Sequence, residues 1–243
     1  MNLIVSDTHE ESSRKASEAI AGFMLDKPNP LICVASGDSP AGIYQEWVKR
    51  VKNKEMDLSS WSFLGLDEWV GLNGSDEGSC RFHLNAQLFF PLKINDKRIC
   101  FFNGAADDLE QECTITEACI QNHGGIEVAI LGLGMNGHIG MNEPNTHANT
   151  RSHIIELDTI TAEVGQKYFK NPRLLSKGIT LGIASLMESK TIILIVNGEK
   201  KAQILKQVME AEITEKIPAS ILRWHPNCFV YADKAAASLI DFA

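Results

Sequence analysis

The chain has 243 residues, of which 44% are hydrophobic and 22% charged, with a mean hydropathy of -0.09 and a formal net charge of -8. This composition is typical of a globular protein with a sizeable core, and the length suits one α/β domain without requiring a second. The acidic balance and the lack of any Lys/Arg run argue against nucleic acid and acidic membrane surfaces as partners.

The cysteines and the N-terminus bear on where the protein works. Six cysteines are scattered along the chain without a Cys-x-x-Cys pair: Cys33, Cys80, Cys100, Cys113, Cys119 and Cys228. We therefore expect no disulfide framework and a reducing, cytoplasmic environment. The N-terminus has no basic stretch followed by an apolar one, and no apolar run approaches ~20 residues, so we expect neither a signal peptide nor a membrane span.

In chain order, short apolar runs alternate with segments of helical periodicity. The predicted strands are residues 3–5, 30–35, 62–66, 99–102, 127–133, 191–196 and 228–231. A capping box of Thr8 and Glu11 opens a predicted helix that runs to about Asp26. Further helices are predicted over residues 40–54, 79–90, 107–123, 161–169 and 199–211.

This alternation predicts a Rossmann-like α/β fold: one domain spanning residues 1–243, with a doubly wound, mostly parallel sheet and helices on both faces. Several strands are apolar throughout, as expected where both faces are covered. Ligands are then expected beyond the carboxyl ends of the strands. Residues 144–176 are polar and weakly periodic, and we expect them to form a lid over the site.

The segment 131–144, Leu-Gly-Leu-Gly-Met-Asn-Gly-His-Ile-Gly-Met-Asn-Glu-Pro, follows the strand predicted at 127–133. Its four glycines remove side chains and permit unusual backbone angles. An imidazole, His138, and a carboxylate, Glu143, stand in that open space with the amides of Asn136 and Asn142. These groups can move protons on a small polar ligand.

The segment Ser36-Gly37-Asp38-Ser39-Pro40 joins a predicted strand to a predicted helix. Such a turn presents backbone N–H donors and the positive end of a helix dipole to an anion, and the serine hydroxyls add donors. The segment lacks the Gly-Lys-Ser/Thr ending of a Walker loop. We predict an anion site here.

Two further strand ends carry charged residues. Asp67 and Glu68 follow the strand at 62–66, and because neighbouring strand residues point to opposite sides, only one of them can face a given pocket. Lys201 lies at a predicted helix start, where a cation opposes the helix dipole unless an anion sits between them.

Taken together and in this order, these segments resemble the glucosamine-6-phosphate deaminase/isomerase and 6-phosphogluconolactonase superfamily over about residues 10–233. The ending Asn142-Glu143-Pro144 and the stretch Gly178-Ile179-Thr180-Leu181-Gly182 are similar to the deaminase branch. Within it, residues 66–70 (Leu-Asp-Glu-Trp-Val), the Gly-Leu-Gly-x-Asn-Gly-His sequence and residues 217–220 (Ile-Pro-Ala-Ser) look closest to galactosamine-6-phosphate deaminase/isomerases.

The resemblance implies a role for each matched position. Asp67 matches the base that moves a proton between C2 and C1 of the opened sugar. His138 matches the residue that opens the pyranose ring, and Glu143 matches its orienting carboxylate. Positions matching the phosphate site are Gly37, Ser39 and Lys201, within a loop that also contains Ser36 and Asp38, and more loosely Lys167. No cofactor or metal is implied, and the expected partner is a small amino-sugar phosphate, with a homo-oligomer possible.

Two positions depart from the family pattern. Asn136 stands where glucosamine enzymes usually have Asp, so it can orient His138 or bind a sugar hydroxyl but cannot supply charge. We expect a contact with the C4 hydroxyl that separates galacto from gluco substrates. Asp38 would repel phosphate if it faced inward, so it must turn away or weaken phosphate binding.

The sequence thus favours an enzyme that converts galactosamine 6-phosphate to tagatose 6-phosphate and ammonia. Conversion of glucosamine 6-phosphate to fructose 6-phosphate and ammonia is the alternative. A sugar-phosphate lactonase and a non-catalytic sugar-phosphate sensor remain as further hypotheses, although a sensor would not need Asp67, His138 and Glu143 together.

Overall fold

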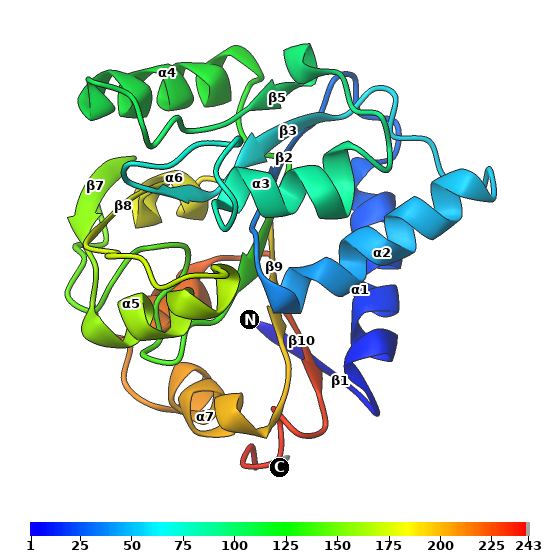
Figure 1. Ribbon diagram of the computed structural model, residues 1–243. Coiled ribbons are helices and arrows are strands. Elements are labelled where there is room, and N and C mark those ends of the chain that lie inside the picture. Colours follow the sequence, from blue (N-terminus) through cyan, green and yellow to red (C-terminus); the bar gives the residue numbers. More distant parts are fainter. Residues whose placement is uncertain (242–243) are drawn as a thin grey trace.

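The computed structural model describes residues 1–241 and contains one seven-stranded parallel sheet with helices on both faces (Figure 1). The strand order is β1-β10-β9-β6-β2-β3-β5, and every neighbouring pair is parallel. The strands are β1 (Asn2–Ser6), β2 (Leu31–Val34), β3 (Ser62–Gly65), β5 (Ile99–Cys100), β6 (Val128–Gly132), β9 (Thr191–Val196) and β10 (Cys228–Asp233). The predicted fold class is confirmed.

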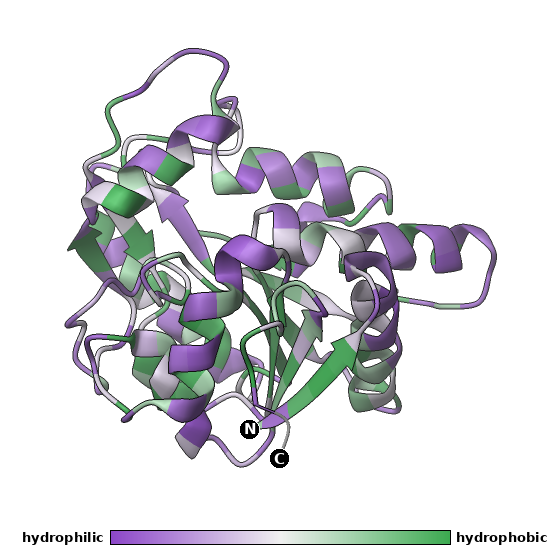
Figure 2. Ribbon diagram, turned by 90° about the horizontal axis from the view of Figure 1, so that it is seen from below, coloured by the Kyte–Doolittle hydropathy of each residue, from purple (hydrophilic) through white to green (hydrophobic). Residues whose placement is uncertain are grey.

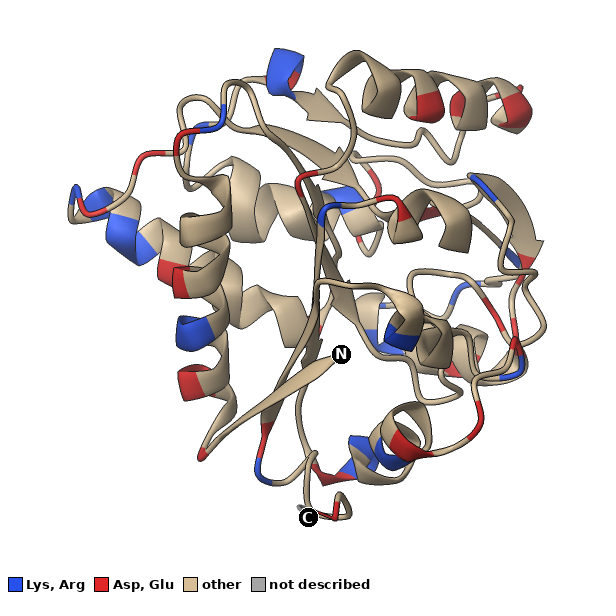
Figure 3. Ribbon diagram, turned by 180° about the vertical axis from the view of Figure 1, so that it is seen from behind, with Lys and Arg blue, Asp and Glu red and all other residues tan. Residues whose placement is uncertain are grey.

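The central strands are apolar throughout because each face of the sheet has its own core. Along β2, Leu31 and Cys33 join one cluster while Ile32 and Val34 join the other. The same alternation of side chains continues along β6 and β9. Figure 2 shows these strands in green between helices whose outer surfaces are purple, and Figure 3 shows the charged residues on the helices and loops around them.

The helices divide between the two faces. Helices α1 (His9–Met24), α2 (Asp38–Lys52) and α3 (Cys80–Leu84), with the π-helical turn η1 (Asn85–Phe89), cover one core. Helices α4 (Leu109–Asn122), α6 (Ile183–Met187) and α7 (Ala202–Glu210), with the 3-10 segment η5 (Pro218–Trp224), cover the other. Of the helices within residues 1–241, none combines the length and apolar character needed to cross a membrane.

Local signals set several helix boundaries. Thr8 caps α1 by accepting a hydrogen bond from the Glu11 N–H at 3.2 Å, as predicted. The Glu11 carboxylate reaches back to the Asp7 N–H at 3.0 Å, one residue earlier than in a standard capping box. The helix predicted over 79–90 is α3 followed by η1, because the Phe90 N–H bonds the Asn85 carbonyl at 2.9 Å, five residues back.

A second sheet was not predicted. It is antiparallel, in the order β4-β8-β7, and consists of β4 (Asp67–Trp69), β8 (Lys177–Thr180) and β7 (His153–Glu156). Its strands are short and mix polar with apolar residues, so they show neither an apolar run nor a clear alternation. Strand β4 follows β3 after a single residue, Leu66, so the chain passes directly from the main sheet into the second one.

This second sheet corrects the predicted lid at residues 144–176. Residues 153–156 form β7 and are fixed to β8, so they do not cover the site. Only α5 (Thr159–Gly165) and the 3-10 turn η3 (Gln166–Tyr168) contribute residues to the cavity described below.

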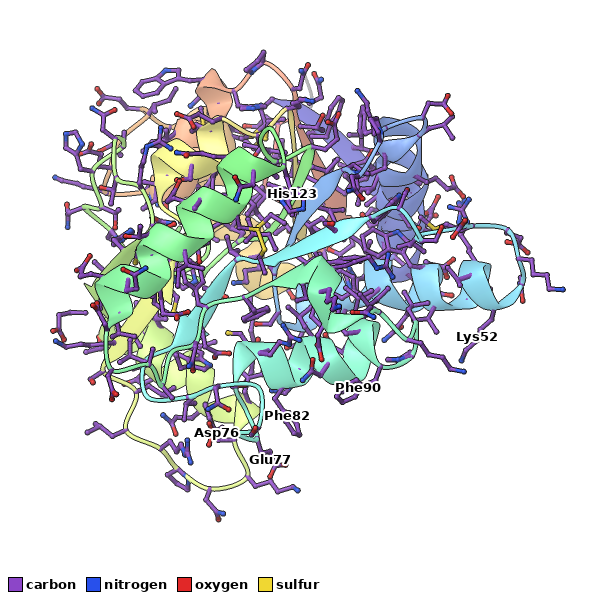
Figure 4. The ribbon with its side chains drawn as sticks, turned by 90° about the horizontal axis from the view of Figure 1, so that it is seen from above. Lys52, Asp76, Glu77, Phe82, Phe90 and His123 are labelled. Atoms are coloured by element: carbon purple, nitrogen blue, oxygen red, sulfur yellow. A yellow bond between two sulfur atoms is a disulfide. The ribbon has the colours of Figure 1, made fainter. Side chains whose placement is uncertain are left out.

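No disulfide framework was expected, but the structure contains one disulfide. Cys100 on β5 and Cys119 on α4 form a disulfide, drawn as a yellow bond near His123 in Figure 4. The other four cysteines are free and buried. The expectation of a reducing, cytoplasmic location relied on the absence of such a bond and loses that support.

Candidate active site

A cavity of about 250 Å³ lies at the carboxyl ends of the central strands. Strands β2 and β6 are neighbours there although the chain leaves them towards opposite edges of the sheet, which is the position where this architecture binds ligands. Eight of the ten predicted site residues line the cavity: Ser36, Gly37, Asp38, Ser39, Asp67, His138, Lys167 and Lys201. The other two, Asn136 and Glu143, lie behind His138.

The loop after β2, where the sequence predicts an anion site, lines the cavity. Gly37 caps α2 with φ 114, a backbone angle that favours glycine, and a Cβ at this position would lie 3.1 Å from the Tyr168 hydroxyl. The first turn of α2 therefore opens onto the cavity with its N–H groups unobstructed. Ser39 Oγ donates to Asn197 Oδ1 at 2.5 Å, which fixes the serine beside these N–H groups.

Two lysines approach this loop from different elements. Lys201 ends the 3-10 turn η4 (Glu199–Lys201), and its Nζ donates to the Leu133 carbonyl at 2.5 Å. Burial, together with the nearby charge of Lys167, lowers the pKa of Lys201 to about 8. Lys167 comes from η3, and its Nζ lies 2.6 Å from Asp38 Oδ2. The cavity thus has two cations, one of which is paired with Asp38.

Asp67 is the first residue of β4 and is 8% exposed. Burial raises the pKa of Asp67 to about 6, and hydrogen bonding from Cys80 and the charge of His138 offset this rise only in part. No lysine or arginine within residues 1–241 forms an ion pair with Asp67. A carboxylate in this state can accept and return a proton near neutral pH.

Glu68 points away from the cavity, which confirms that only one of the two neighbouring acids faces it. Its carboxylate is fully buried and accepts hydrogen bonds from three backbone N–H groups, those of Trp69 at 2.9 Å, Cys80 at 2.8 Å and Arg81 at 2.9 Å. Glu68 therefore ties β4 to the start of α3 and sets Cys80 beside Asp67 at the cavity wall.

The glycine-rich turn after β6 holds His138 against Glu143. The His138 Nδ1 lies 3.3 Å from Glu143 Oε2, and Gly134 is required because a Cβ there would collide with the imidazole ring. Burial alone would raise the pKa of Glu143. Hydrogen bonds from His138, Thr161 and Asn136 outweigh this effect and hold the pKa below its usual value. An ionised Glu143 can orient the ring and stabilise its protonated form.

Asn136 is not among the residues that line the cavity, and its amide is directed at other side chains. Its Nδ2 donates to Glu143 Oε2 at 2.8 Å, and its Oδ1 accepts from the His138 N–H at 3.2 Å. The nitrogen and the oxygen of the Asn136 amide thus both bond to the His138–Glu143 pair. Of the two roles that the sequence left open, the geometry matches the orienting one.

The cavity lining also includes polar side chains that were not singled out from the sequence, among them Cys80, Thr161, Tyr168 and Asn197. Thr161 and Tyr168 belong to a stretch without clear periodicity, and Asn197 and Cys80 have no neighbouring motif. Within residues 1–241, no group of three or more His, Cys, Asp or Glu side chains is placed to hold a metal ion.

Residues 5–230 match the family described as glucosamine-6-phosphate isomerases/6-phosphogluconolactonase. The chain belongs to this family of sugar-phosphate enzymes. A glucosamine-6-phosphate deaminase from Thermoanaerobacter pseudethanolicus is 36% identical over 241 residues, covering 99% of this chain and 95% of the relative. One from Clostridium botulinum is 38% identical over 242 residues, covering 99% of both.

Solved structures of the family resemble this one closely. A structure described as a monomeric glucosamine-6-phosphate deaminase superposes with a TM-score of 0.95 at 33% identity, covering 98% of this chain and 100% of the other. A 6-phosphogluconolactonase from Trypanosoma brucei gives a TM-score of 0.76 at 18% identity, covering 99% and 98%, which shows a shared fold only. The relatives at 36–38% identity are named for glucosamine and not for galactosamine, against the branch that the motifs favoured.

Proposed function

We propose that the chain acts as a single-domain deaminating isomerase that converts glucosamine 6-phosphate and water to fructose 6-phosphate and ammonia. The observation that carries this proposal is one cavity holding an anion-binding helix start, an unpaired buried carboxylate and a Glu-oriented imidazole. The names of relatives at 36–38% identity support glucosamine as the sugar.

In this proposal the phosphate is held by the N–H groups at Gly37 and Ser39 and by Lys201 and Lys167. His138 takes the proton from the O1 hydroxyl and delivers one to the ring oxygen, which opens the pyranose. Asp67 then moves the C2 proton to C1 along one face of the open chain. Water adds at C2, and ammonia leaves.

The position of Asn136 is the reason for preferring glucosamine over galactosamine here. The sequence argument for a galacto preference depended on a contact between Asn136 and the C4 hydroxyl, whereas this amide is directed at Glu143 and His138. Without that contact, the resemblance at residues 66–70 and 217–220 is the remaining argument for galactosamine 6-phosphate as the substrate.

The test is ammonia release from glucosamine 6-phosphate and galactosamine 6-phosphate, measured side by side with hydrolysis of 6-phosphogluconolactone. We expect kcat/KM to be highest with glucosamine 6-phosphate and the lactone to be unchanged. A strong preference for galactosamine 6-phosphate would restore the alternative, and lactone hydrolysis without ammonia release would place the chain with the lactonases.

The same assay separates an enzyme from a sensor. Asp67→Asn should abolish turnover while binding of an open-chain amino-alditol 6-phosphate survives. If the wild-type protein binds that analogue but releases no ammonia from either sugar, the cavity is a sensor site.

A further inference from the structure

Residues 159–168, which comprise α5 and η3 and are called the covering segment here, contact both halves of the cavity. Near its start, Thr161 reaches His138. At its end, Lys167 reaches Asp38 on the anion-binding loop. One short segment therefore touches both the group assigned to ring opening and the loop assigned to phosphate.

Thr161 makes the shortest contact to the His138 imidazole. Its Oγ1 lies 3.0 Å from His138 Nδ1, compared with 3.3 Å from that nitrogen to Glu143 Oε2. The threonine is 6% exposed, so water does not compete freely for this position.

Glu143 and Thr161 together select one form of the ring. The ionised carboxylate and the hydroxyl oxygen can both accept from Nδ1–H, which keeps the proton on Nδ1. The lone pair of Nε2 is then free, and within residues 1–241 Nε2 has no hydrogen-bond partner. This is the form that can take a proton from a sugar hydroxyl in the cavity.

The covering segment packs on the apolar cluster of Trp69 and Leu175 through Ala162, Gly165 and Tyr168. Two of its apolar side chains are not packed in this way: Ile160 and Val164 line the cavity and remain 44% and 42% exposed. The polar contacts at the two ends add to this packing.

We propose that Thr161 is a positioning residue for His138. This rests on the proposed function. The threonine hydroxyl and the Glu143 carboxylate both meet Nδ1, so together they hold the imidazole by one nitrogen and leave Nε2 for the substrate.

The experiment replaces the hydroxyl without changing the shape of the side chain. Thr161→Val should lower kcat roughly 10- to 100-fold, less than the loss of a general base itself would. It should also shift the pH dependence of kcat, because His138 loses the group that fixes its tautomer. Thr161→Ser, which retains the hydroxyl, should recover most of the rate. Thr159→Val, on the same helix with an exposed side chain, is the matched control and should leave the rate unchanged.

Full activity and an unaltered pH profile in Thr161→Val, or failure of Thr161→Ser to recover the rate, would overturn the positioning role.

Two measurements distinguish a failure of the positioning role from local unfolding and from a failure of the proposed function. Binding of the open-chain amino-alditol 6-phosphate should be nearly unchanged in Thr161→Val, since this ligand has no ring to open. Loss of that binding would mean local unfolding and overturn the positioning role. Absence of ammonia release in the wild-type protein would instead remove the proposed function.

Discussion

Lys167 Nζ lies 2.6 Å from Asp38 Oδ2, so a carboxylate occupies the side of the anion site where a phosphate is expected. Both side chains are substantially exposed, at 47% and 70%, and such a pair contributes roughly 0–1 kcal/mol to stability. In the proposed site Asp38 would compete with phosphate for Lys167, so we expect it to act mainly on ligand binding.

Asp38→Asn should strengthen phosphate binding. The substitution removes a negative charge beside the phosphate position and keeps a side chain of the same shape at the first residue of α2. We therefore expect KM to fall roughly three- to tenfold with little change in kcat. Steady-state kinetics at low ionic strength would measure this, with the effect shrinking as salt screens the charges. Glu77→Gln is the matched control, because Glu77 forms a similar exposed ion pair with Lys170. An unchanged or raised KM in Asp38→Asn would show that Asp38 does not oppose the phosphate.

The pH dependence of kcat/KM should be bell-shaped. The base Asp67 must be ionised, and its pKa is raised to about 6, so activity should fall as pH drops through this value. Lys201 must be protonated to hold the phosphate, and its pKa is lowered to about 8, so activity should fall as pH rises through that value.

The alkaline limb can be assigned with one variant. Lys201→Arg keeps a charge that does not titrate in this range, so kcat/KM should be lower but should no longer decline near pH 8. An alkaline limb that persists in this variant would have to come from another group.

Much of the site was accessible from sequence because its groups are local. Ser36–Pro40, Asp67 and residues 131–144 each follow an apolar strand directly, and parallel strands bring their carboxyl ends to one edge of the sheet. Once the fold class is inferred, these short segments must meet.

The rest depends on packing between distant residues. Thr161 lies 23 positions after His138, and no local pattern reveals that the two meet. The sequence left two roles open for Asn136 and could not decide between them, because the turn at Gly137, with φ 86, sets the direction of the amide. The second sheet was missed because its short strands mix polar and apolar residues without a clear pattern.

The thiol of Cys80 should influence the pKa of Asp67, the proposed base. Its thiol lines the cavity and offsets part of the burial effect on the pKa of Asp67. Burial raises the pKa of Cys80 well above its usual value, so the thiol is neutral and can donate. Cys80→Ala should therefore move the acidic limb to higher pH, costing roughly two- to fivefold near pH 6 and little at pH 7.5.

A matched control for this change is available on α4. Cys113 is also a buried free cysteine but does not line the cavity, so Cys113→Ala should leave the acidic limb in place. Cys80→Ser keeps a donor and should stay close to the wild-type profile. A shift to lower pH in Cys80→Ala would mean that the thiol does not stabilise the ionised base.

The Cys100–Cys119 disulfide should add to stability rather than to turnover. It closes a loop across 19 positions between β5 and α4, and loop-closure entropy for such a length is worth about 3 kcal/mol. Neither residue lines the cavity. Dithiothreitol should lower the Tm of the wild-type protein by roughly 6 to 12 °C and leave kcat unchanged at 25 °C. The double variant Cys100→Ser with Cys119→Ser should already have the lower Tm and should not respond to the reductant.

Equal Tm values with and without dithiothreitol in the wild-type protein would contradict this prediction. Either the bond is then not formed in solution, or it does not constrain the unfolded chain. Non-reducing mass spectrometry distinguishes these two cases.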